Sequence, residues 1–289
     1  MVRKNRRIAL FMAAISISLI SCKDKIDAPV PEQETPVKDC MEITFYGSHA
    51  PYSKTVLNDE AVLWETGDEV KVLWGDNKFY KSYVTPYNSS ANAEFKAEVE
   101  DAAAYYGVYP YSAASSLVDN RLTVTVPQTQ TGLFADAGIT VAKADAENMM
   151  KFRHIVSYLE FSIDKPGTLT ISGGKPLAGD VTVSEFDENG ITDYSVSEGA
   201  SSVIVDVKAS GTYYVALLPD AKFDYLLLSL DDGDSVSSAL STNKISMQPG
   251  KLLALGNVTG RFKSGNALGA TLEPFEIIDF SFETSAVSF

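Results

Sequence analysis

The sequence predicts an all-β protein, and three observations support this prediction. Apolar and polar residues alternate with a period close to two from about residue 40 onward, so that Val70, Val72 and Trp74 share one face. Turn signals rich in Gly, Pro, Asn and Asp separate these segments at short intervals, as at residues 75–77 and 166–167. No window of useful length carries the apolar stripe of an amphipathic helix.

The first 21 residues are predicted to be a signal peptide. Basic residues at positions 3, 4, 6 and 7 precede an apolar run over residues 8–20, which is too short to span a bilayer comfortably. The run ends in Leu-Ile-Ser-Cys at residues 19–22, which resembles the lipobox of bacterial lipoproteins. We therefore expect Cys22 to be the first mature residue and to carry the lipid. A transmembrane stub and an ordinary secretory signal are the alternatives.

Residues 22–39 are predicted to form a disordered tether. Three prolines stand there among Asp, Glu, Gln and Lys, with almost nothing apolar to bury. Its opening, Cys-Lys-Asp-Lys, partly resembles the charged signals that send lipoproteins of the Bacteroidetes group to the outside of the outer membrane. A plain solvated linker is the alternative. We expect a lipid-anchored protein of the cell outer membrane that is exposed at the cell surface.

The charge of the chain argues against nucleic acid as a partner. Removal of residues 1–21 takes four positive charges from a formal net charge of −14, which leaves about −18. A phosphate backbone is recruited by clustered Lys and Arg, and the mature chain keeps only Arg121, Arg153 and Arg261 as arginines. The same acidity discourages adsorption to an anionic bilayer, so the acyl chains on Cys22 must hold the protein at the membrane.

Neither cofactor nor metal is expected. His49 and His154 are the only histidines and stand far apart in the sequence, and Cys40 has no partner at zinc spacing. Once Cys22 is acylated, Cys40 is the only thiol left, so we expect a lone half-buried thiol and no intrachain disulfide; a disulfide with another chain is the alternative. No nucleophile elbow, phosphate loop or dinucleotide fingerprint is present. The catalytic class is therefore the least favoured.

About 268 mature residues suffice for two ordinary domains or one large β domain, and we expect two. Residues 40–165 and 166–262 are predicted to form them, and residues 263–289 a spacer with a C-terminal strand. Around residues 137–150 we expect a loop, a strand near residues 139–141 and one short helical turn. The inward faces of further strands are predicted from alternating residues: Leu122, Val124 and Val126; Leu159, Phe161 and Ile163; Val203, Val205 and Val207; Tyr213, Val215 and Leu217.

An ordered set of motifs resembles the fimbrillin-like lipoproteins of Bacteroidales. The set includes Trp-Glu-Thr-Gly-Asp at 64–68, Tyr-Tyr-Gly-Val-Tyr-Pro-Tyr at 105–111, Val-Pro-Gln-Thr-Gln at 126–130 and Phe-Arg-His at 152–154. Residues 247–258 resemble the closing hairpin of the second domain of that family. The structural motif residues are therefore expected to be Trp64, Gly67, Asp68, Tyr109, Pro110, Pro127, Gln130 and His154.

The resemblance implies a pilus subunit made of two tandem transthyretin-like β-sandwiches. In polymerising members a trypsin-like protease cuts after an early Arg and removes the first strand, and a strand from the next subunit fills the groove. This chain departs from that pattern, since its first mature arginine is Arg121. Cleavage at a lysine such as Lys54, a role as an anchored or tip subunit, and a surface lipoprotein that never polymerises all stay open.

Two surface features have alternative interpretations. The tyrosines at residues 105–111 could form a glycan-binding strip, but core packing by one parity and loop capping by the other is the simpler interpretation. Asp231, Asp232 and Asp234 could ligate calcium, but a loop of this length lacks further ligands, and a polar hairpin tip is the simpler interpretation.

The C-terminal residues again alternate, with Ile278, Phe280 and Phe282 on one strand face. Such a strand needs a groove, since exposed it would promote aggregation. The groove could belong to the same molecule or to a neighbouring subunit.

The first functional hypothesis is a non-enzymatic surface lipoprotein that acts as a fimbrial subunit, anchor or adhesin. Other fimbrial subunits, glycans and host surface proteins are its candidate partners. The alternative is a glycan-binding lipoprotein of a nutrient-uptake system, which also uses an acylated cysteine, a linker and β-sandwiches.

Overall fold

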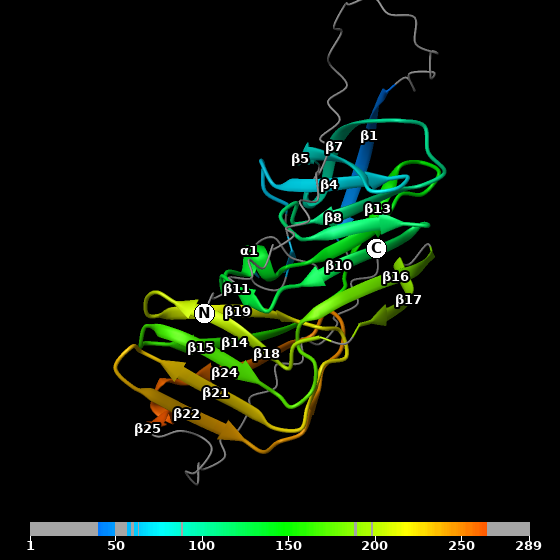
Figure 1. Ribbon diagram of the computed structural model, residues 1–289. Helices are drawn as coiled ribbons and strands as arrows, with labels where there is room; N and C mark the ends of the chain where they lie inside the picture. Colours follow the sequence, from blue (N-terminus) through cyan, green and yellow to red (C-terminus); the bar gives the residue numbers. More distant parts are fainter. Residues whose placement is uncertain are drawn as a thin grey trace, which may run out of the picture.

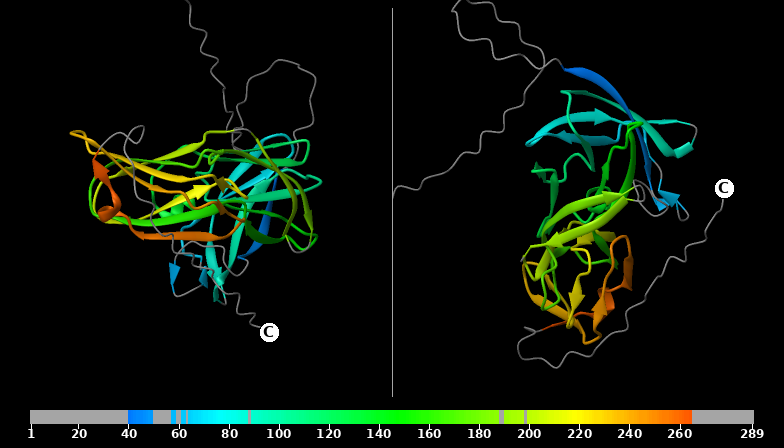
Figure 2. Two further views of the ribbon diagram at one scale, coloured as in Figure 1. Left: turned by 90° about the horizontal axis from the view of Figure 1, so that it is seen from below. Right: turned by 90° about the vertical axis from the view of Figure 1, so that its right-hand side faces the viewer.

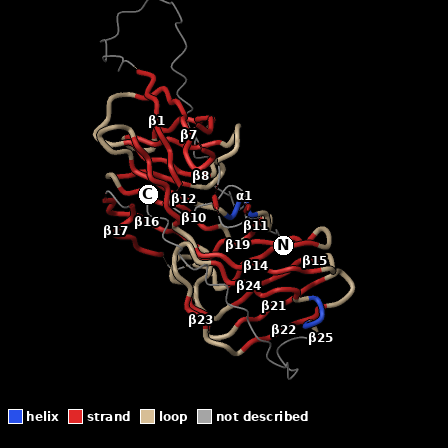
Figure 3. Tube along the Cα trace, turned by 180° about the vertical axis from the view of Figure 1, so that it is seen from behind, coloured by secondary structure: helices blue, strands red, loops and turns tan. Residues whose placement is uncertain are grey.

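The computed structural model describes residues 40–49, 57–58, 61–62, 64–87, 89–187, 190–197 and 199–264. Strands dominate these residues, which confirms the all-β prediction (Figure 3). The signal peptide, the tether and Cys22, together with Lys54, Ile278, Phe280 and Phe282, lie outside the described residues.

The first lobe contains an eight-stranded sheet and a four-stranded sheet in the described part of the chain (Figure 1). The order of the larger sheet is β5-β4-β8-β12-β13-β1-β7-β6. Its strands are β1 (Met41–His49), β4 (Glu69–Trp74), β5 (Lys78–Tyr83), β6 (Thr85–Tyr87), β7 (Ser89–Val99), β8 (Tyr105–Tyr109), β12 (Thr140–Lys143) and β13 (Met149–His154). The smaller sheet has the order β17-β16-β10-β9 and consists of β9 (Ser115–Val118), β10 (Arg121–Val126), β16 (Gly179–Asp187) and β17 (Gly190–Val196).

The second lobe contains a six-stranded sheet and a three-stranded sheet, counted over the same described ranges. The larger has the order β11-β18-β15-β21-β22-β25 and consists of β11 (Thr129–Gln130), β15 (Gly167–Ser172), β18 (Ser202–Val207), β21 (Leu226–Asp231), β22 (Val236–Ser241) and β25 (Lys263–Ser264). The smaller has the order β19-β14-β24 and consists of β14 (Ser157–Ile163), β19 (Gly211–Leu217) and β24 (Leu252–Asn257).

Short elements complete the described chain. Two small two-stranded sheets are formed by β2 (Leu57–Asn58) with β3 (Ala61–Val62), and by β20 (Lys222–Phe223) with β23 (Ile245–Ser246). The helices are α1 (Phe134–Ala137) and the 3₁₀ turn η1 (Thr259–Arg261). Among the residues that the structure describes, no helix has the length and apolar character needed to cross a bilayer.

Three groups of buried apolar side chains hold the sheets together. One group, which includes Phe45, Trp64 and Phe95, lies on the inner face of the curved eight-stranded sheet. A second joins that sheet to the four-stranded sheet through residues such as Leu122 and Val183. The third fills the second lobe between its two sheets and holds every member of the Leu159, Phe161, Ile163 and Val203, Val205, Val207 sets. The strand faces predicted from alternation are therefore confirmed.

The sheets do not follow the boundary predicted between residues 165 and 166. Strand β14 precedes this boundary, yet it pairs with β19 and β24 of the second lobe. Strands β16 and β17 follow it, yet β16 pairs with β10 of the first lobe over five residue positions, from Leu122 opposite Val183 to Val126 opposite Gly179. Alternation along one strand does not specify its neighbours, because strand pairing joins residues far apart in sequence.

Cys40 also differs from the expectation. It is exposed and disulfide-bonded, whereas a lone half-buried thiol was predicted. Cys22 is the only other cysteine of the sequence. A lipid thioether on Cys22 would remove the thiol that a bond with Cys40 requires, so lipidation and an intrachain disulfide exclude each other.

The two lobes give the molecule an elongated shape. Strand β1 lies in the lobe at one end, and β25 lies at the opposite end (Figure 1). The side view in Figure 2 shows the same separation between the blue strands and the orange strands. The described chain therefore enters at one lobe and leaves at the other.

We predict that residues 40–165 expressed alone do not fold. The β9–β10 hairpin would lose β16, and two-stranded hairpins are at best marginally stable in water. A well-dispersed amide NMR spectrum is expected for residues 40–264, which serve as the control, and a collapsed spectrum for the fragment. A dispersed spectrum of the fragment would contradict the interlocked arrangement.

Candidate functional site

Strand β1 occupies a central position in the eight-stranded sheet, and this position is the candidate functional site. Its residues pair in parallel with β13, from Tyr46 opposite Met149, and antiparallel with β7, from Met41 opposite Val99. Removal of β1 would expose the facing edges of β7 and β13. Their backbone N–H and C=O groups would then form a groove that accepts a strand.

The inner face of β1 sets the shape of this groove. Phe45 is fully buried, with its ring centroid 5.8 Å from that of Phe95 and 5.6 Å from that of Tyr105. A Cβ atom at Gly47 would lie 3.0 Å from the Phe95 ring and 3.4 Å from the rings of Phe152 and Trp64. The position therefore requires a large side chain followed, two residues later, by a small one.

Five of the eight motif residues form a corner beside this groove. The indole of Trp64 packs edge-on against Tyr109 and Phe152, with ring centroids 5.4 Å and 5.3 Å apart. The hydroxyl of Tyr109 donates to Asp68 Oδ1 at 3.4 Å, and Asp68 Oδ2 accepts the Glu65 amide at 2.9 Å. Gly67 has a φ of +96°, which a turn residue without Cβ adopts freely.

The contacts of this corner are structural. Burial, followed by the negative charge of Asp68, raises the pKa of the Tyr109 phenol, so Tyr109 stays neutral and donates a hydrogen bond to the carboxylate. The peptide bond between Tyr109 and Pro110 is cis, and the Pro110 carbonyl accepts the Ala113 amide at 3.0 Å. The corner thereby fixes the ends of β4 and β8 against the inner face of β1.

The other three motif residues lie apart from the corner. Pro127 and Gln130 belong to residues 127–132, which we call the strap, and the strap runs along the second lobe. Gln130 Nε2 donates to the carbonyls of Pro127 at 2.9 Å and Ala216 at 2.7 Å. His154 Nδ1 bonds the hydroxyl of Tyr158, which is buried where the lobes meet. The motif thus marks two structural positions, the corner and the lobe junction.

The tyrosine cluster does not form an exposed strip. Tyr105, Tyr106 and Tyr109 are buried, and the hydroxyl of Tyr105 donates to the Glu100 carbonyl at 2.9 Å. Tyr111 is half-buried, and its ring lies 4.4 Å from Lys81 Nζ. The core-packing interpretation therefore accounts for three of the four tyrosines.

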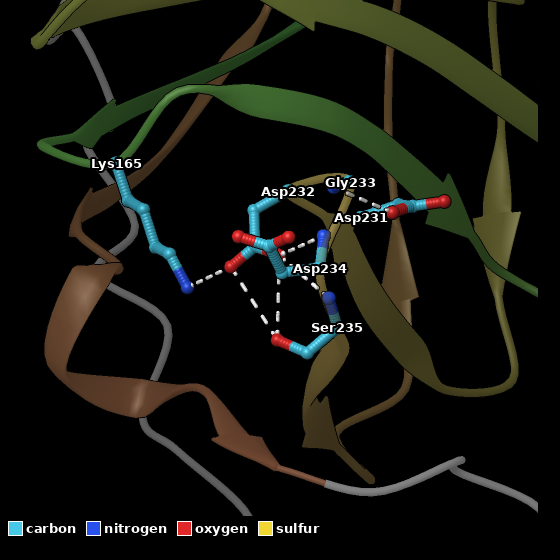
Figure 4. Close-up of polar contacts among 6 residues, drawn as sticks. All are labelled: Lys165, Asp231, Asp232, Gly233, Asp234 and Ser235. Carbon is cyan, nitrogen blue, oxygen red and sulfur yellow. Dashed lines mark hydrogen bonds and ion pairs between the residues drawn. The ribbon is translucent and has the colours of Figure 1, made fainter.

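The acidic hairpin at residues 231–235 uses its carboxylates internally. Asp232 Oδ1 accepts the amides of Asp234 at 3.1 Å and Ser235 at 2.8 Å, and the Gly233 amide donates to Asp231 Oδ1 at 3.0 Å (Figure 4). Asp232 also forms an ion pair with Lys165. Across the described residues, no group of three or more His, Cys, Asp and Glu side chains is placed to hold a metal ion.

Several residues of the sites were not identified from sequence. Gly47 is one, although a glycine inside an alternating strand is a known sign of close backbone approach. Asn77 is another: its Oδ1 accepts the Leu117 amide at 2.8 Å, and its own amide donates to the Leu117 carbonyl at 2.9 Å. Phe134 of α1 does belong to the ordered motif set, but its packing was not predicted: its ring centroid lies 5.7 Å from that of Tyr158 and 5.2 Å from that of Tyr214.

Comparison with known proteins places this fold in context. The sequence matches the model of the fimbrillin-like family over residues 54–267. No curated protein matches the sequence.

Solved structures with partial similarity include two candidate cell adhesion proteins. One, from Bacteroides ovatus ATCC 8483, is 13% identical with a TM-score of 0.48 and covers 84% of this chain and 99% of its own. The other, from Bacteroides uniformis ATCC 8492, is 14% identical with a TM-score of 0.46, and the match covers 83% of this chain and 99% of the other. A fimbrial assembly protein from Parabacteroides distasonis ATCC 8503 is 12% identical with a TM-score of 0.35, and the match covers 81% of this chain and 100% of the other.

We predict that Asp232→Asn lowers the melting temperature at pH 7 by a small amount, because it removes the ion pair with Lys165. The Lys165 ammonium and the hairpin amides lower the pKa of Asp232 to about 2, from an ordinary value of about 3.9. The stabilisation is therefore fully present above about pH 4 and is lost as the pH falls through about 2.

Differential scanning fluorimetry across this pH range should show the melting temperatures of the wild type and Asp232→Asn converging. Asp234→Asn, a charge-matched control in the same turn, should have a smaller effect at pH 7. A difference between wild type and Asp232→Asn that stays constant down to about pH 2 would contradict this account.

Proposed function

The chain belongs to the fimbrillin-like family, and we propose that it is a non-enzymatic surface protein that serves as a fimbrial subunit, anchor or adhesin and assembles by strand addition. The observation that carries this proposal is the position of β1. It is the first described strand of the chain, and it lies inside a sheet, between β13 and β7, from which a single cut after β1 could free it.

The arginines of the described chain do not suit this cut. Arg121 begins β10 directly after the tight turn at Asp119 and Asn120, both of which have positive φ. Cleavage there would break the β9–β10 hairpin and would leave β1 attached to the first lobe. Lys54, which follows β1 in the sequence, is the better candidate, because cleavage after it would separate β1 from everything downstream.

The C-terminal residues are the proposed donor. A donor strand that runs in the direction of β1 must match its inner face, where Ile43 and Phe45 precede the small Gly47. Of the alternating residues Ile278, Phe280 and Phe282, the two phenylalanines fit the positions of Ile43 and Phe45, and Thr284 then falls at the crowded Gly47 position. The alternative register would place Phe282 against Phe95, Phe152 and Trp64.

The lipid anchor completes the proposed arrangement. Acyl chains on Cys22 would hold the protein at the outer membrane, and residues 22–39 would connect them to β1, which begins at Met41. A subunit that keeps β1 would remain an anchored subunit, and one that loses β1 would become free to accept a donor strand.

We predict that labelled palmitate enters the wild-type chain and that Cys22→Ala abolishes the incorporation. The lipid is expected on Cys22 because the lipobox precedes it. Cys40→Ala is the matched control, since it removes the other cysteine and should keep full labelling. Labelling that survives Cys22→Ala, or wild-type protein without label, would overturn the proposed localisation.

We predict that deletion of residues 270–289 leaves a folded protein that no longer enters oligomers or fibres. Among the described residues, those that form the buried core of the second lobe run from Leu159 to Phe262 and lie upstream of the deletion. Folding is followed by thermal unfolding and assembly by electron microscopy of purified surface fibres. Unfolding of the second lobe after the deletion would show instead that the strand is intramolecular.

Within the same experiment, point variants test the register. Phe282→Ala should weaken assembly more than Ile278→Ala, because only Phe282 enters the groove at the Phe45 position in the proposed register. Equal effects of the two variants would reject this register. The donor role itself would still be tested by the deletion of residues 270–289.

A further inference from the structure

The strap, residues 127–132, closes one side of the second lobe. Strand β11 pairs in parallel with β18, the next strand of the six-stranded sheet, with Thr129 opposite Ile204 and Gln130 opposite Val205. The Ile204 amide donates to the Gln128 carbonyl at 2.8 Å. The strap therefore lies along β18 as a short added strand.

The same segment also bonds the edge strand of the facing sheet. Gln130 Oε1 accepts the Ala216 amide at 2.8 Å while Gln130 Nε2 donates to the Ala216 carbonyl at 2.7 Å, so this side-chain amide pairs with β19 as a peptide group would. The Tyr214 amide donates to the Gly132 carbonyl at 2.8 Å. One segment thus satisfies backbone groups on both sheets at this side of the lobe.

Contacts with α1 hold the strap in place. Thr131 Oγ1 donates to Asp136 Oδ2 at 2.7 Å, and Phe134 packs on Tyr214 of β19 (Figure 3 shows α1 beside β11 and β19). Upstream, the strap continues directly from β10 of the first lobe. Its position is therefore fixed from both ends by the folded chain.

We propose that the strap is an intramolecular guard that prevents the β18–β19 side of the second lobe from accepting a strand of another copy of this chain. The inference rests on the proposed strand addition and deepens it, because it assigns strand acceptance to the β1 position. Strand edges with open backbone groups pair readily with other chains, and proteins avoid this by covering them. Removing β1 requires one cut after β1, whereas the strap is continuous with β10 and α1.

The fit around Gly132 offers a way to lift the strap. Gly132 has a φ of +77°, and a Cβ atom there would lie 2.5 Å from the Tyr213 ring and 2.9 Å from Val205. Gly132→Ala should therefore displace the strap from both sheets. Gly174→Ala is the matched control, because Gly174 has the same φ of +77° and lies in another loop, against Tyr225.

The test uses the purified chain and a fluorescein-labelled peptide with the sequence of residues 126–133. Fluorescence polarisation should show binding to Gly132→Ala at least about tenfold tighter than to wild type, since opening the strap raises the binding-competent fraction. Gly174→Ala should bind like wild type. Light scattering should show that Gly132→Ala forms dimers or larger oligomers while the other two stay monomeric.

A folded Gly132→Ala variant that neither binds the peptide nor self-associates would overturn the guard. If Gly132→Ala does not fold, Gln130→Ala serves as the test variant, because it removes only the two side-chain hydrogen bonds to Ala216 and the one to Pro127. It should bind the peptide more tightly than wild type, and equal binding would overturn the proposal. The assay involves no fibre, so its failure is separate from a failure of the C-terminal deletion to block assembly.

Discussion

The pairing of β10 with β16 is the contact on which the two-lobed arrangement depends. Strand β16 lies in sequence between β15 and β18 of the second lobe, yet its Val181 and Val183 are fully buried in the first. Complete burial of a valine or leucine stabilises a fold by about 1.5–3 kcal/mol. The hydroxyls of Thr123 and Thr182 add a bond at 2.9 Å on the outer side of the same pair. Without this pairing, the first lobe would lack half of its four-stranded sheet.

The exchange is reciprocal, because the first half of the chain gives the strap and α1 to the second lobe. The apolar core of the first lobe also continues into the junction through Tyr158, Ala216 and Leu218. Burial raises the pKa of Tyr158, and burial with the nearby Glu160 raises the pKa of Tyr214 to about 12, so both phenols stay neutral at the junction. The lobes are therefore parts of one interlocked unit, and tension between β1 and β25 would pass through paired strands.

Features that depend on residues close together in the sequence could be predicted, whereas features that depend on contacts distant in sequence could not. The faces of Val70, Val72 and Trp74 were correct, because side-chain alternation is a property of one strand. The boundary at residue 165 was misplaced, because the partners of a strand are decided by contacts distant in sequence. Gln130 was identified through the family motif, but no local pattern indicates that its amide bonds Ala216 across 86 positions. The disulfide bond of Cys40 was not predicted, because a lipid was expected on Cys22, the only other cysteine of the sequence.

The β1 position and the β18–β19 side, the two places where a strand of another copy could pair, differ in how their present occupants are joined to the rest of the chain. At the β1 position, the described chain continues from the occupant at one end only, and a replacement strand would have to fit the small space at Gly47. At the β18–β19 side, the occupant is joined at both ends and is bonded to both sheets. In the proposed assembly, an incoming strand would replace β1 once a single peptide bond is cut. It would replace the strap only if the strap, which stays joined to β10 and α1, were first displaced from both sheets. Directional assembly would then follow from chain connectivity, because a cut removes β1 from its groove whereas the strap remains attached beside its own site.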